Sequence, residues 1–369
     1  MSIHIHPDVY AQEGSYPPER VLGLKTHQWK PTALSMADEK TVLHVGPVNT
    51  RGGMATVIRI LSENPPDGWR AETLATHTEG SNLVKFLCWR KARRQLIVKL
   101  KQNPPDIVHI HTASDYSWWR KRRVALLCIK AKIPVIMHIH SGKFHHFCAT
   151  KKGEEVRRIC NTDGIYAVTL SEYWNSKLDD WLDESITIFN PLDPELLQKD
   201  SVRQENQVLF MGRSDPIKEA ELAIAAIDEA RKTRPQLQLM MTGIDNSNQL
   251  SIQHSEKEWF HPLGWVDERR KMELLNESSL LLVPSRFECQ PMVVIEALHC
   301  GLPVLASPAV AEAINGVYDI GSWNVKDWAE AIINPPIINN INQDYHLLNN
   351  ISGEWSKLYL KMVNRGNTE

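Results

Sequence analysis

The 369-residue sequence predicts an α/β protein with two doubly wound domains, each built on a parallel sheet. Short buried strands alternate with helical segments along most of the chain. This pattern stops in a polar stretch near residue 190 and then restarts as a second, similar set. The hydrophobic content of 42% is sufficient for two cores, and the length exceeds that of a usual single domain.

The first set of elements begins with a strand at 41–45, followed by a loop and a helix over 54–62. Further buried strands are expected at 106–111, 134–140 and 164–170, with loops and helical segments between them. Strands that alternate with helices in this way form parallel sheets. We therefore expect a Rossmann-like first domain.

The second set contains a strand at 208–211, a helix over 219–232 and a strand at 237–241. Because the two sets are similar in kind and in length, they indicate two domains and not a short-period repeat. The last segment of the chain has the pattern of an amphipathic helix. The expected parts are an N-terminal extension at 1–40, a first domain at 41–190, a linker at 191–206, a second domain at 207–345 and a C-terminal helix at 346–369.

Composition excludes several classes of protein. The net charge of −2 gives no general reason to expect nucleic-acid binding. The chain begins without the layout of a signal peptide, and no apolar run approaches the roughly 18 residues that span a bilayer. We expect a cytoplasmic protein with reduced thiols, because its cysteines show neither paired nor metal-binding spacing. These are Cys88, Cys128, Cys148, Cys160, Cys289 and Cys300.

The most informative segment is 284–298, in which two carboxylates, Glu288 and Glu296, bracket the start of a helix. Pro291 suits the first turn of this helix, since it lacks an N–H group that would be unpaired there. The free N–H groups of that turn make a seat for an anion beside Glu288. Strand-like residues precede the loop at 279–283, so this seat lies at the carboxyl end of a strand, where open α/β sheets bind ligands.

The pattern S-R-F-E-x-x-P-x-x-x-x-E-A-L-x-x-G-x-P-V in this segment resembles the signature of the retaining, nucleotide-sugar-dependent glycosyltransferases of family 4. Two acids at this spacing would by themselves be read as solvated residues at a helix start. The resemblance implies the GT-B fold, in which two Rossmann-like domains face a cleft and the last helix crosses back to the first domain. It also implies that Glu288 touches the donor sugar and Glu296 the ribose. The donor-binding residues expected between them are Gln290, Pro291, Met292 and Val293.

A second motif, Gly212-Arg213-Ser214-Asp215-Pro216-Ile217-Lys218, follows a strand and precedes a helix. A departing nucleoside diphosphate gains negative charge, so a fixed Arg and Lys stabilise the transition state more than the ground state. In the family that this sequence resembles, Arg and Lys at this spacing clamp the donor diphosphate. We expect Arg213 and Lys218 to take that role, and the alternative is a pair of surface cations.

Gly52 and Gly53 lie between the first strand and the first helix. Glycines there let the backbone approach a ligand closely and expose its amides. The generic dinucleotide pattern G-x-G-x-x-G is absent. The resemblance implies that this loop lies over the cleft near the donor phosphates, and the alternative is a turn without a ligand.

A histidine-rich segment follows the strand at 134–140. His138 and His140 share one face of the strand by its two-residue period, and the family has a catalytic histidine at the end of this strand. His140 fits that position best, His138 is expected to pack inside, and His145 or His146 to face the acceptor. We expect neither a metal nor another cofactor, since no nearby Cys or carboxylate completes a ligand set.

Positive charge gathers between residues 81 and 135, where thirteen Lys or Arg residues accompany two acids. The segments 85–101 and 118–123 combine cations with apolar or aromatic residues, which favours peripheral contact with an anionic membrane or a lipid-linked acceptor. A solvated helix face is the alternative, and no motif supports nucleic acid.

The function we expect from this resemblance is retaining transfer of a hexose-type sugar from a nucleotide-diphosphate donor to a hydroxyl of a glycan or lipid-linked saccharide, in cell-surface polysaccharide or glycolipid synthesis. Two alternatives stay open: a catalytically degenerate scaffold subunit, and a sugar-phosphate synthase or phosphorylase on the same fold. The sequence names neither the sugar nor the acceptor, and a departure from the family pattern after Pro303 leaves the sugar pocket undefined.

Overall fold

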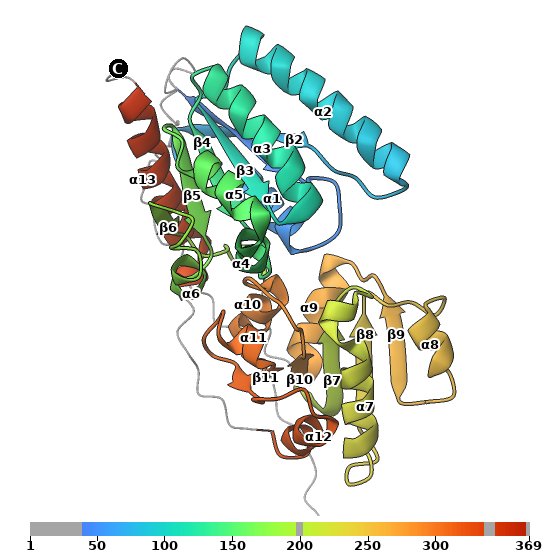
Figure 1. Ribbon diagram of the computed structural model, residues 1–369. Helices are drawn as coiled ribbons and strands as arrows, with labels where there is room; N and C mark the ends of the chain where they lie inside the picture. Colours follow the sequence, from blue (N-terminus) through green and yellow to red (C-terminus); the bar gives the residue numbers. More distant parts are fainter. Residues whose placement is uncertain (1–38, 197–201, 336–343, 367–369) are drawn as a thin grey trace, which may run out of the picture. The chain divides into compact units, whose positions relative to one another are not determined.

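The computed structural model describes residues 39–196, 202–335 and 344–366. All but the end of the expected N-terminal extension (1–40) lies outside the described residues, as do residues 197–201 of the expected linker (191–206). Both sheets belong to one unit, Glu39–Glu369. The predicted α/β class, with two doubly wound parallel sheets, is confirmed (Figure 1).

The first sheet has six parallel strands in the order β2-β1-β3-β4-β5-β6. The strands are β1 (Lys40–Gly46), β2 (Trp69–Ala75), β3 (Ile107–Thr112), β4 (Val135–Ile139), β5 (Ile165–Thr169) and β6 (Ser185–Thr187). The helices between them are α1 (Gly53–Glu63), α2 (Asn82–Gln102), α3 (Asp115–Lys130), α4 (Phe144–Phe147), α5 (Gly153–Cys160) and α6 (Glu172–Ser176), with a π-helical turn at Cys148–Lys152.

The second sheet repeats this plan with six parallel strands in the order β12-β11-β10-β7-β8-β9. Its strands are β7 (Gln204–Met211), β8 (Gln238–Thr242), β9 (Phe260–Gly264), β10 (Ser278–Val283), β11 (Val304–Ala306) and β12 (Tyr318–Asp319). Its helices are α7 (Ala220–Ala230), α8 (Gln249–Gln253), α9 (Glu268–Glu277), α10 (Met292–His299), α11 (Pro308–Ala311) and α12 (Val325–Ile333), with 3₁₀ turns at Pro216–Lys218 and Asp344–His346.

Hydrophobic residues cover both faces of each sheet, because successive side chains of a strand point to opposite sides. In β1, Val42 joins a core with residues of α1, while Leu43 joins one with residues of α2 and α3. In β7, Leu209 and Val208 divide in the same way, toward α9 and α10 on one face and α7 and α12 on the other. This double burial explains why the strands read as continuous apolar runs.

The last helix, α13 (Leu348–Gly366), packs against strands of the first sheet although it follows the second in sequence. The Tyr359 hydroxyl lies 2.9 Å from Nδ1 of His109 in β3. Trp355 is fully buried beside the same histidine, with ring centroids 4.4 Å apart. The chain passes between the two sheets next to this helix, where the Leu192 N–H donates to the His346 carbonyl at 2.7 Å.

The structure differs from the sequence prediction at several element boundaries. β7 begins at Gln204, inside the expected linker, because polar residues at its start pair with β10 even though they are exposed. Pro291 caps α10 from outside and does not occupy the first turn, with φ −70° and ψ 122°. Among the described helices, none combines the length and apolar character needed to cross a membrane.

Candidate functional site

Three groups of predicted site residues follow strands at the switch points of the two sheets. In each sheet the strand order reverses between two central strands, β1 and β3 in the first and β7 and β10 in the second. Ligands of open α/β sheets bind where the loops that follow such strands diverge. The Gly52-Gly53 loop follows β1, the Arg213–Lys218 loop follows β7, and Glu288 follows β10.

Glu288 and Lys218 form an ion pair between the loops after β10 and β7. Their side chains are 12% and 21% exposed, so the pair is largely but not completely shielded from water. Backbone contacts hold the two loops together, since the Arg286 N–H donates to the Ile217 carbonyl at 2.8 Å. The structure thus brings together two residues that the sequence places 70 positions apart.

Arg213 lies in the same loop with an exposed side chain. Within the described part of the chain, its guanidinium has no ion-pair partner. The Asp215 side chain accepts a hydrogen bond from the Ile217 N–H at 3.1 Å and so caps the short 3₁₀ turn that carries Lys218. Among the described residues this loop therefore offers one guanidinium without an ion-pair partner and one amine, that of Lys218, which Glu288 holds just before α10.

Glu296 is buried inside α10, where it pairs with Lys271 of α9 at 2.8 Å. Its side chain is 3% exposed, and burial raises the pKa of the carboxyl against the opposing effect of Lys271. Burial alone would lower the pKa of Lys271, but Glu296 and Glu268 together keep it above the ordinary value. A carboxylate held in this way is a fixed hydrogen-bond acceptor.

The loop after β4 in the first domain touches Glu288 directly. A Cβ atom on Gly142 would lie 2.4 Å from the Glu288 carbonyl oxygen and 2.9 Å from its amide nitrogen, so no larger residue fits there. Trp174 of α6 donates its indole N–H to the Cys289 carbonyl at 2.7 Å. These contacts fix the Glu288 loop against the domain that carries His140.

Gln290 has a clear structural role that sequence reasoning missed. Its side-chain oxygen accepts from the Asn190 N–H at 2.6 Å, and its amide donates to the Leu170 carbonyl at 2.8 Å. Gln290 is 5% exposed, so its side chain ties the loop to the first domain. Next along the chain, Met292 is buried and Val293 half-buried at the start of α10.

The glycine loop after β1 lies beside the amino terminus of α10. A Cβ atom on Gly53 would lie 3.4 Å from Cγ of Met292, an ordinary contact distance. Gly52 has φ 122° and ψ 165°, a conformation that only glycine adopts readily, and it precedes α1 as its N-cap. The neighbouring Arg51 guanidinium lies 5.2 Å from the ring centre of Trp265, which follows β9.

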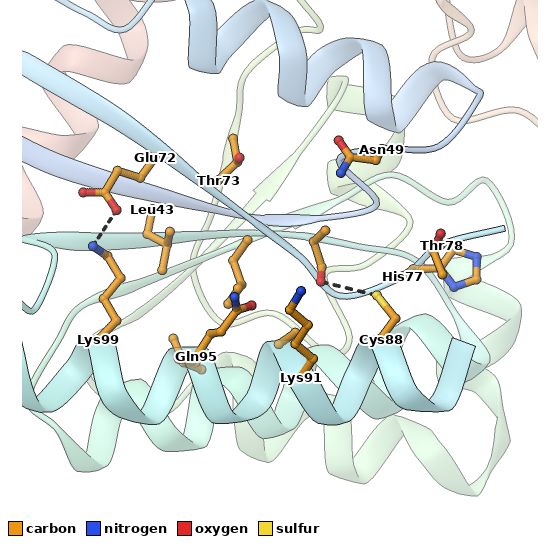
Figure 2. Close-up of a pocket in the computed structure, with 14 residues that line it drawn as sticks. Leu43, Asn49, Glu72, Thr73, His77, Thr78, Cys88, Lys91, Gln95 and Lys99 are labelled. Carbon is orange, nitrogen blue, oxygen red and sulfur yellow. Dashed lines mark hydrogen bonds and ion pairs between the residues drawn. The ribbon is translucent and has the colours of Figure 1, made fainter. Parts of the chain in front are cut away.

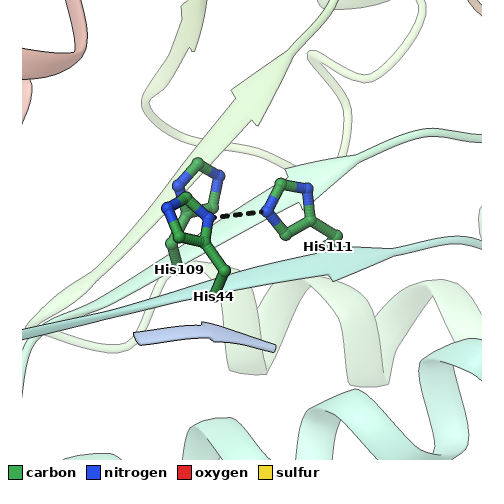
Figure 3. Close-up of side chains that lie close together, drawn as sticks. All are labelled: His44, His109 and His111. Carbon is green, nitrogen blue, oxygen red and sulfur yellow. Dashed lines mark hydrogen bonds between the residues drawn. The ribbon is translucent and has the colours of Figure 1, made fainter. Parts of the chain in front are cut away.

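His140 directly follows β4 and lies at the outer end of a network of histidines (Figure 3 shows three of them). Its Nε2 lies 3.0 Å from Nδ1 of His111, whose Nε2 lies 3.1 Å from Nδ1 of His44. Burial and the nearby charge of Lys121 lower the pKa of His140 to about 3, which keeps the ring neutral. A neutral, half-buried imidazole at this edge can donate or accept one hydrogen bond.

A parallel chain of contacts runs from Tyr359 through His109 to His138, with 3.1 Å between His109 Nε2 and His138 Nδ1. The predicted pairing of His138 and His140 on one face is confirmed, with ring centres 4.0 Å apart. His138 is fully buried, and its Nε2 has no hydrogen-bond partner. His44, His109 and His111, and separately His111, His138 and His140, each place three ring nitrogens within 4.8 Å, a spacing that could hold a metal ion.

His145 and His146 occupy the short helix α4 beside the Glu288 loop. The His146 ring meets Phe287 edge-on at 5.7 Å, and His145 lies 5.5 Å from the ring of Trp174. Lys143, just before this helix, places its amine 4.6 Å from the ring centre of Phe287. Lys143, Gly142 and Trp174 were not identified from the sequence, because their importance comes from contacts with a loop more than a hundred residues away.

The basic segments behave differently from one another. In 85–101, which lies within α2, Phe86 and Leu87 are half-exposed, and so are Leu83 and Val84 just before it. In 118–123, within α3, Trp118 and Lys121 are each 1% exposed. Trp118 and Lys121 therefore do not belong to the surface of aromatic rings and cations expected at 118–123, because one face of α3 packs on the first sheet.

Comparison with known proteins finds a family match in the second half of the chain. Residues 205–334 match the family described as "Glycosyl transferases group 1". A D-inositol 3-phosphate glycosyltransferase of Gordonia bronchialis is 32% identical over 149 residues, which cover 35% of this chain and 32% of the relative. The chain thus spans about a third of the length of the first curated relatives that it matches. An "Uncharacterized 41.2 kDa protein in cps region" of Klebsiella pneumoniae is 27% identical over 72% of this chain and 80% of its own length.

Solved structures resemble the whole fold. A sucrose-phosphate synthase from Thermosynechococcus elongatus superimposes with a TM-score of 0.66 at 15% identity, covering 88% of this chain and 100% of the other. The Anabaena protein HepE in complex with UDP-glucose gives 0.60 at 14% identity, covering 89% and 98%. The fold is therefore GT-B, as the resemblance in the sequence implied.

Proposed function

We propose that this protein is a nucleotide-sugar-dependent glycosyltransferase that moves a hexose-type sugar to a hydroxyl of a glycan or lipid-linked saccharide. The observation that carries the proposal is the Lys218–Glu288 pair beside the exposed Arg213, at the switch point of the second sheet. An unpaired guanidinium and an amine next to a helix amino terminus suit a diphosphate. The group 1 match over 205–334 and the UDP-glucose bound by HepE support the same kind of donor.

Each site residue has one task in this proposal. Arg213 and Lys218 neutralise the charge of the leaving diphosphate. When Lys218 turns from Glu288 to the phosphates, the Glu288 carboxylate accepts hydrogen bonds from hydroxyl groups of the sugar. Glu296 accepts from the ribose, and Gly52 and Gly53 bring backbone amides close to the donor. Contacts within the protein support these roles, because Lys271 holds Glu296 and the Glu288 loop packs closely on Gly142.

The transfer retains the anomeric configuration in this proposal, so the acceptor hydroxyl attacks on the face from which the diphosphate leaves. The departing phosphate takes the acceptor proton, and His140 contributes a neutral hydrogen bond to the sugar. Glu288 does not act as the nucleophile of a glycosidase pair, since a diphosphate clamp has no use in hydrolysis. The polysaccharide or glycolipid pathway expected from the sequence belongs to the same proposal.

The proposed reaction needs no metal, because Arg213 and Lys218 supply the positive charge at the diphosphate. The need for a metal can be tested directly, because the histidine clusters described above have a spacing that could hold an ion. Treatment with EDTA followed by gel filtration is expected to leave the transfer rate unchanged. Loss of activity that Mg²⁺ or Zn²⁺ restores would contradict a metal-free reaction.

Peripheral membrane contact is proposed for the first turns of α2. Leu83, Phe86 and Leu87 are between 50% and 66% exposed, and Lys85 and Arg90 lie among them. Apolar side chains among cations suit an interface with anionic lipid. Sedimentation with phosphatidylglycerol vesicles is expected to carry down the wild type and to lose the Leu83→Ser/Leu87→Ser variant, and equal sedimentation of the two would contradict this site.

Thermal unfolding in the presence of UDP, GDP, ADP or CDP tests the donor site. One of these is expected to stabilise the protein, by about 2.7 kcal/mol at a hundredfold excess over its dissociation constant. Glu296→Gln should weaken that effect. Glu268→Gln is the matched control, since Glu268 also contacts Lys271 but is 69% exposed. Stabilisation by none of them would favour the alternative of a scaffold that has lost the chemistry.

A sugar-phosphate synthase or phosphorylase on the same fold is the second alternative from the sequence. It would share the diphosphate or phosphate clamp and use a small soluble acceptor. Activity assays with a soluble sugar phosphate and with a lipid-linked saccharide separate the two, because a transferase of the proposed kind uses the second.

A further inference from the structure

Lys121 is a buried amine for which the described residues supply no counter-ion, and burial together with the charge of Arg120 lowers its pKa to about 7. It lies in α3, is 1% exposed, and donates to the hydroxyl of the equally buried Thr76 at 2.7 Å. No carboxylate forms an ion pair with it in the described part of the chain. Burying a charge without an opposite charge costs free energy, which functional sites recover when a ligand of opposite charge binds.

Further positive charge surrounds Lys121. Burial and the charges of Arg120, Lys85 and Lys121 lower the pKa of His77. His77 Nδ1 and Arg120 Nε are buried atoms that find no hydrogen-bond partner among the described residues. Both side chains are half-buried, so a ligand can reach them from solvent.

Two acids of this domain, Glu79 and Glu155, have other partners. Glu79 accepts a hydrogen bond from the Arg51 N–H at 3.2 Å and is exposed. Glu155 pairs with Arg122 and accepts from the Trp118 indole at 3.4 Å. The charge of Glu79 opposes the effect of these cations on His77, but no described carboxylate forms an ion pair with Arg120, Lys121 or Lys85.

This cluster lies at the same edge of the first sheet as His140. Thr76 and His77 directly follow β2, and His140 follows β4. Burial is the main cause of the lowered pKa of His140, and the charge of Lys121 is close enough to lower that pKa further. Because the proposed donor site belongs to the second domain, we assign a ligand bound at this edge of the first domain, beside His140, as the acceptor.

A cavity of about 500 Å³ opens beside the cluster, between β2 and α2 (Figure 2). His77, Thr78 and Asn49 lie at one end, and the Glu72–Lys99 ion pair lies at the other. Lys91 and Gln95 of α2 line the space between them. The cavity could accommodate a group attached to an anion bound at His77.

We propose that the acceptor carries a phosphate or pyrophosphate group, and that His77, Arg120 and Lys121 bind this group on the first domain. The inference rests on the proposed transferase function and names its acceptor class. Arg120 Nε and a ring nitrogen of His77 lack partners among the described residues, and the Lys121 amine donates only to a hydroxyl, so the three groups match the oxygen-rich surface of a phosphate. The bound anion pairs the buried charge of Lys121 and leaves the acceptor near His140.

Titration with inorganic pyrophosphate tests this site. The Arg213→Ala/Lys218→Ala background is used for every variant, because it removes both cations of the other diphosphate clamp. Pyrophosphate is expected to bind this protein, and Arg120→Gln and Lys121→Met should each weaken the affinity at least tenfold. Arg123→Gln is the control, since Arg123 belongs to α3 but stacks on Trp119 at 3.7 Å. No binding, or equal affinity in Arg120→Gln and Arg123→Gln, would overturn the proposal.

Two further measurements sharpen the result. Thermal unfolding of the half-buried Arg120→Gln variant should match that of the control, so that lost binding is not lost folding. Decyl phosphate binds more tightly than inorganic phosphate if the acceptor is lipid-linked, and equally if it is a soluble phosphate. The donor titration with nucleoside diphosphates uses wild-type Arg213, so its failure and the failure of the phosphate site are distinguishable.

Discussion

A Cβ atom at position 142 would lie 2.4 Å from the backbone carbonyl oxygen of Glu288. Gly142 belongs to the loop after β4 in the first domain, and Glu288 to the loop after β10 in the second. The position of the proposed sugar-binding carboxylate therefore depends on the absence of a side chain in the other domain. His140 stands two residues before Gly142, so the same approach fixes the spacing of both groups.

Gly142→Ala is expected to lower transfer activity by about a hundredfold, because a displacement of about 1 Å at a reacting centre has an effect of that size. Steady-state kinetics should show the loss in kcat more than in KM for the acceptor. Gly353→Ala is the control, since a Cβ there meets no atom within 4 Å. Unchanged activity in Gly142→Ala would mean that the two loops separate freely.

Lys271→Met should destabilise the protein by about 3–5 kcal/mol, the usual effect of removing one partner from a buried ion pair. The cause is Glu296, which is 3% exposed and would lose its counter-ion. Urea unfolding measures the difference. Arg269→Met on the same helix is the control, because Arg269 is 79% exposed and its ion pair with Glu273 should contribute less than about 1 kcal/mol. Equal effects of the two substitutions would contradict the structural role given to Lys271.

The buried histidines should make the protein acid-sensitive above the range in which carboxylates titrate. Burial lowers the pKa of His44 and His140 to about 3, and those of His109, His111 and His138 well below the ordinary value of 6.5. Below pH 6.5 the unfolded chain binds more protons than the folded one, so stability falls as the pH falls from 6.5 toward 3.

Each of these histidines contributes a slope of up to about 1.4 kcal/mol per pH unit in that window. Urea unfolding at a series of pH values is the measurement. Replacing His44 by Asn should lower by about one the number of protons taken up on unfolding, and so reduce the slope by the contribution of one histidine. A free energy of unfolding that stays constant between about pH 7 and pH 5 would contradict the neutral, buried histidine network.

Much of the fold could be predicted because its signal is local. The strands at 41–45 and 208–211 are apolar runs buried on both faces, and such runs need no knowledge of distant contacts. β2 was missed because its sequence, Trp69–Ala75, mixes polar and apolar residues as an edge strand does. Edge strands lack the continuous apolar pattern of central ones.

The candidate-site residues that belong to a sequence motif could be predicted. Glu288, Arg213 and Lys218 follow their strands as the sequence indicated, and the structure places Lys218 against Glu288. Their roles toward a donor stay predictions. Lys271 could not have been predicted, because its contact with Glu296 joins two helices through space and neither neighbourhood has a motif for it.

The histidine network was visible only in part. The two-residue spacing in β3 and β4 gives His109 with His111 and His138 with His140 on shared faces, but the contact between strands requires their register. His111 pairs with His138 in that register, and His44 joins from β1 opposite His109. Sequence spacing alone could therefore suggest pairs but not the network that leaves His140 at its outer end.

The central claim is that the exposed Arg213 acts on a leaving diphosphate. The most direct test compares the rate of nucleoside diphosphate release in wild type, Arg213→Ala and Arg269→Ala, with the donor that the thermal unfolding panel identifies. Removal of one such charge-stabilising group usually lowers kcat by about 10²–10³-fold. We predict that loss for Arg213→Ala and wild-type turnover for Arg269→Ala. Full turnover in Arg213→Ala would contradict the account and place the diphosphate elsewhere.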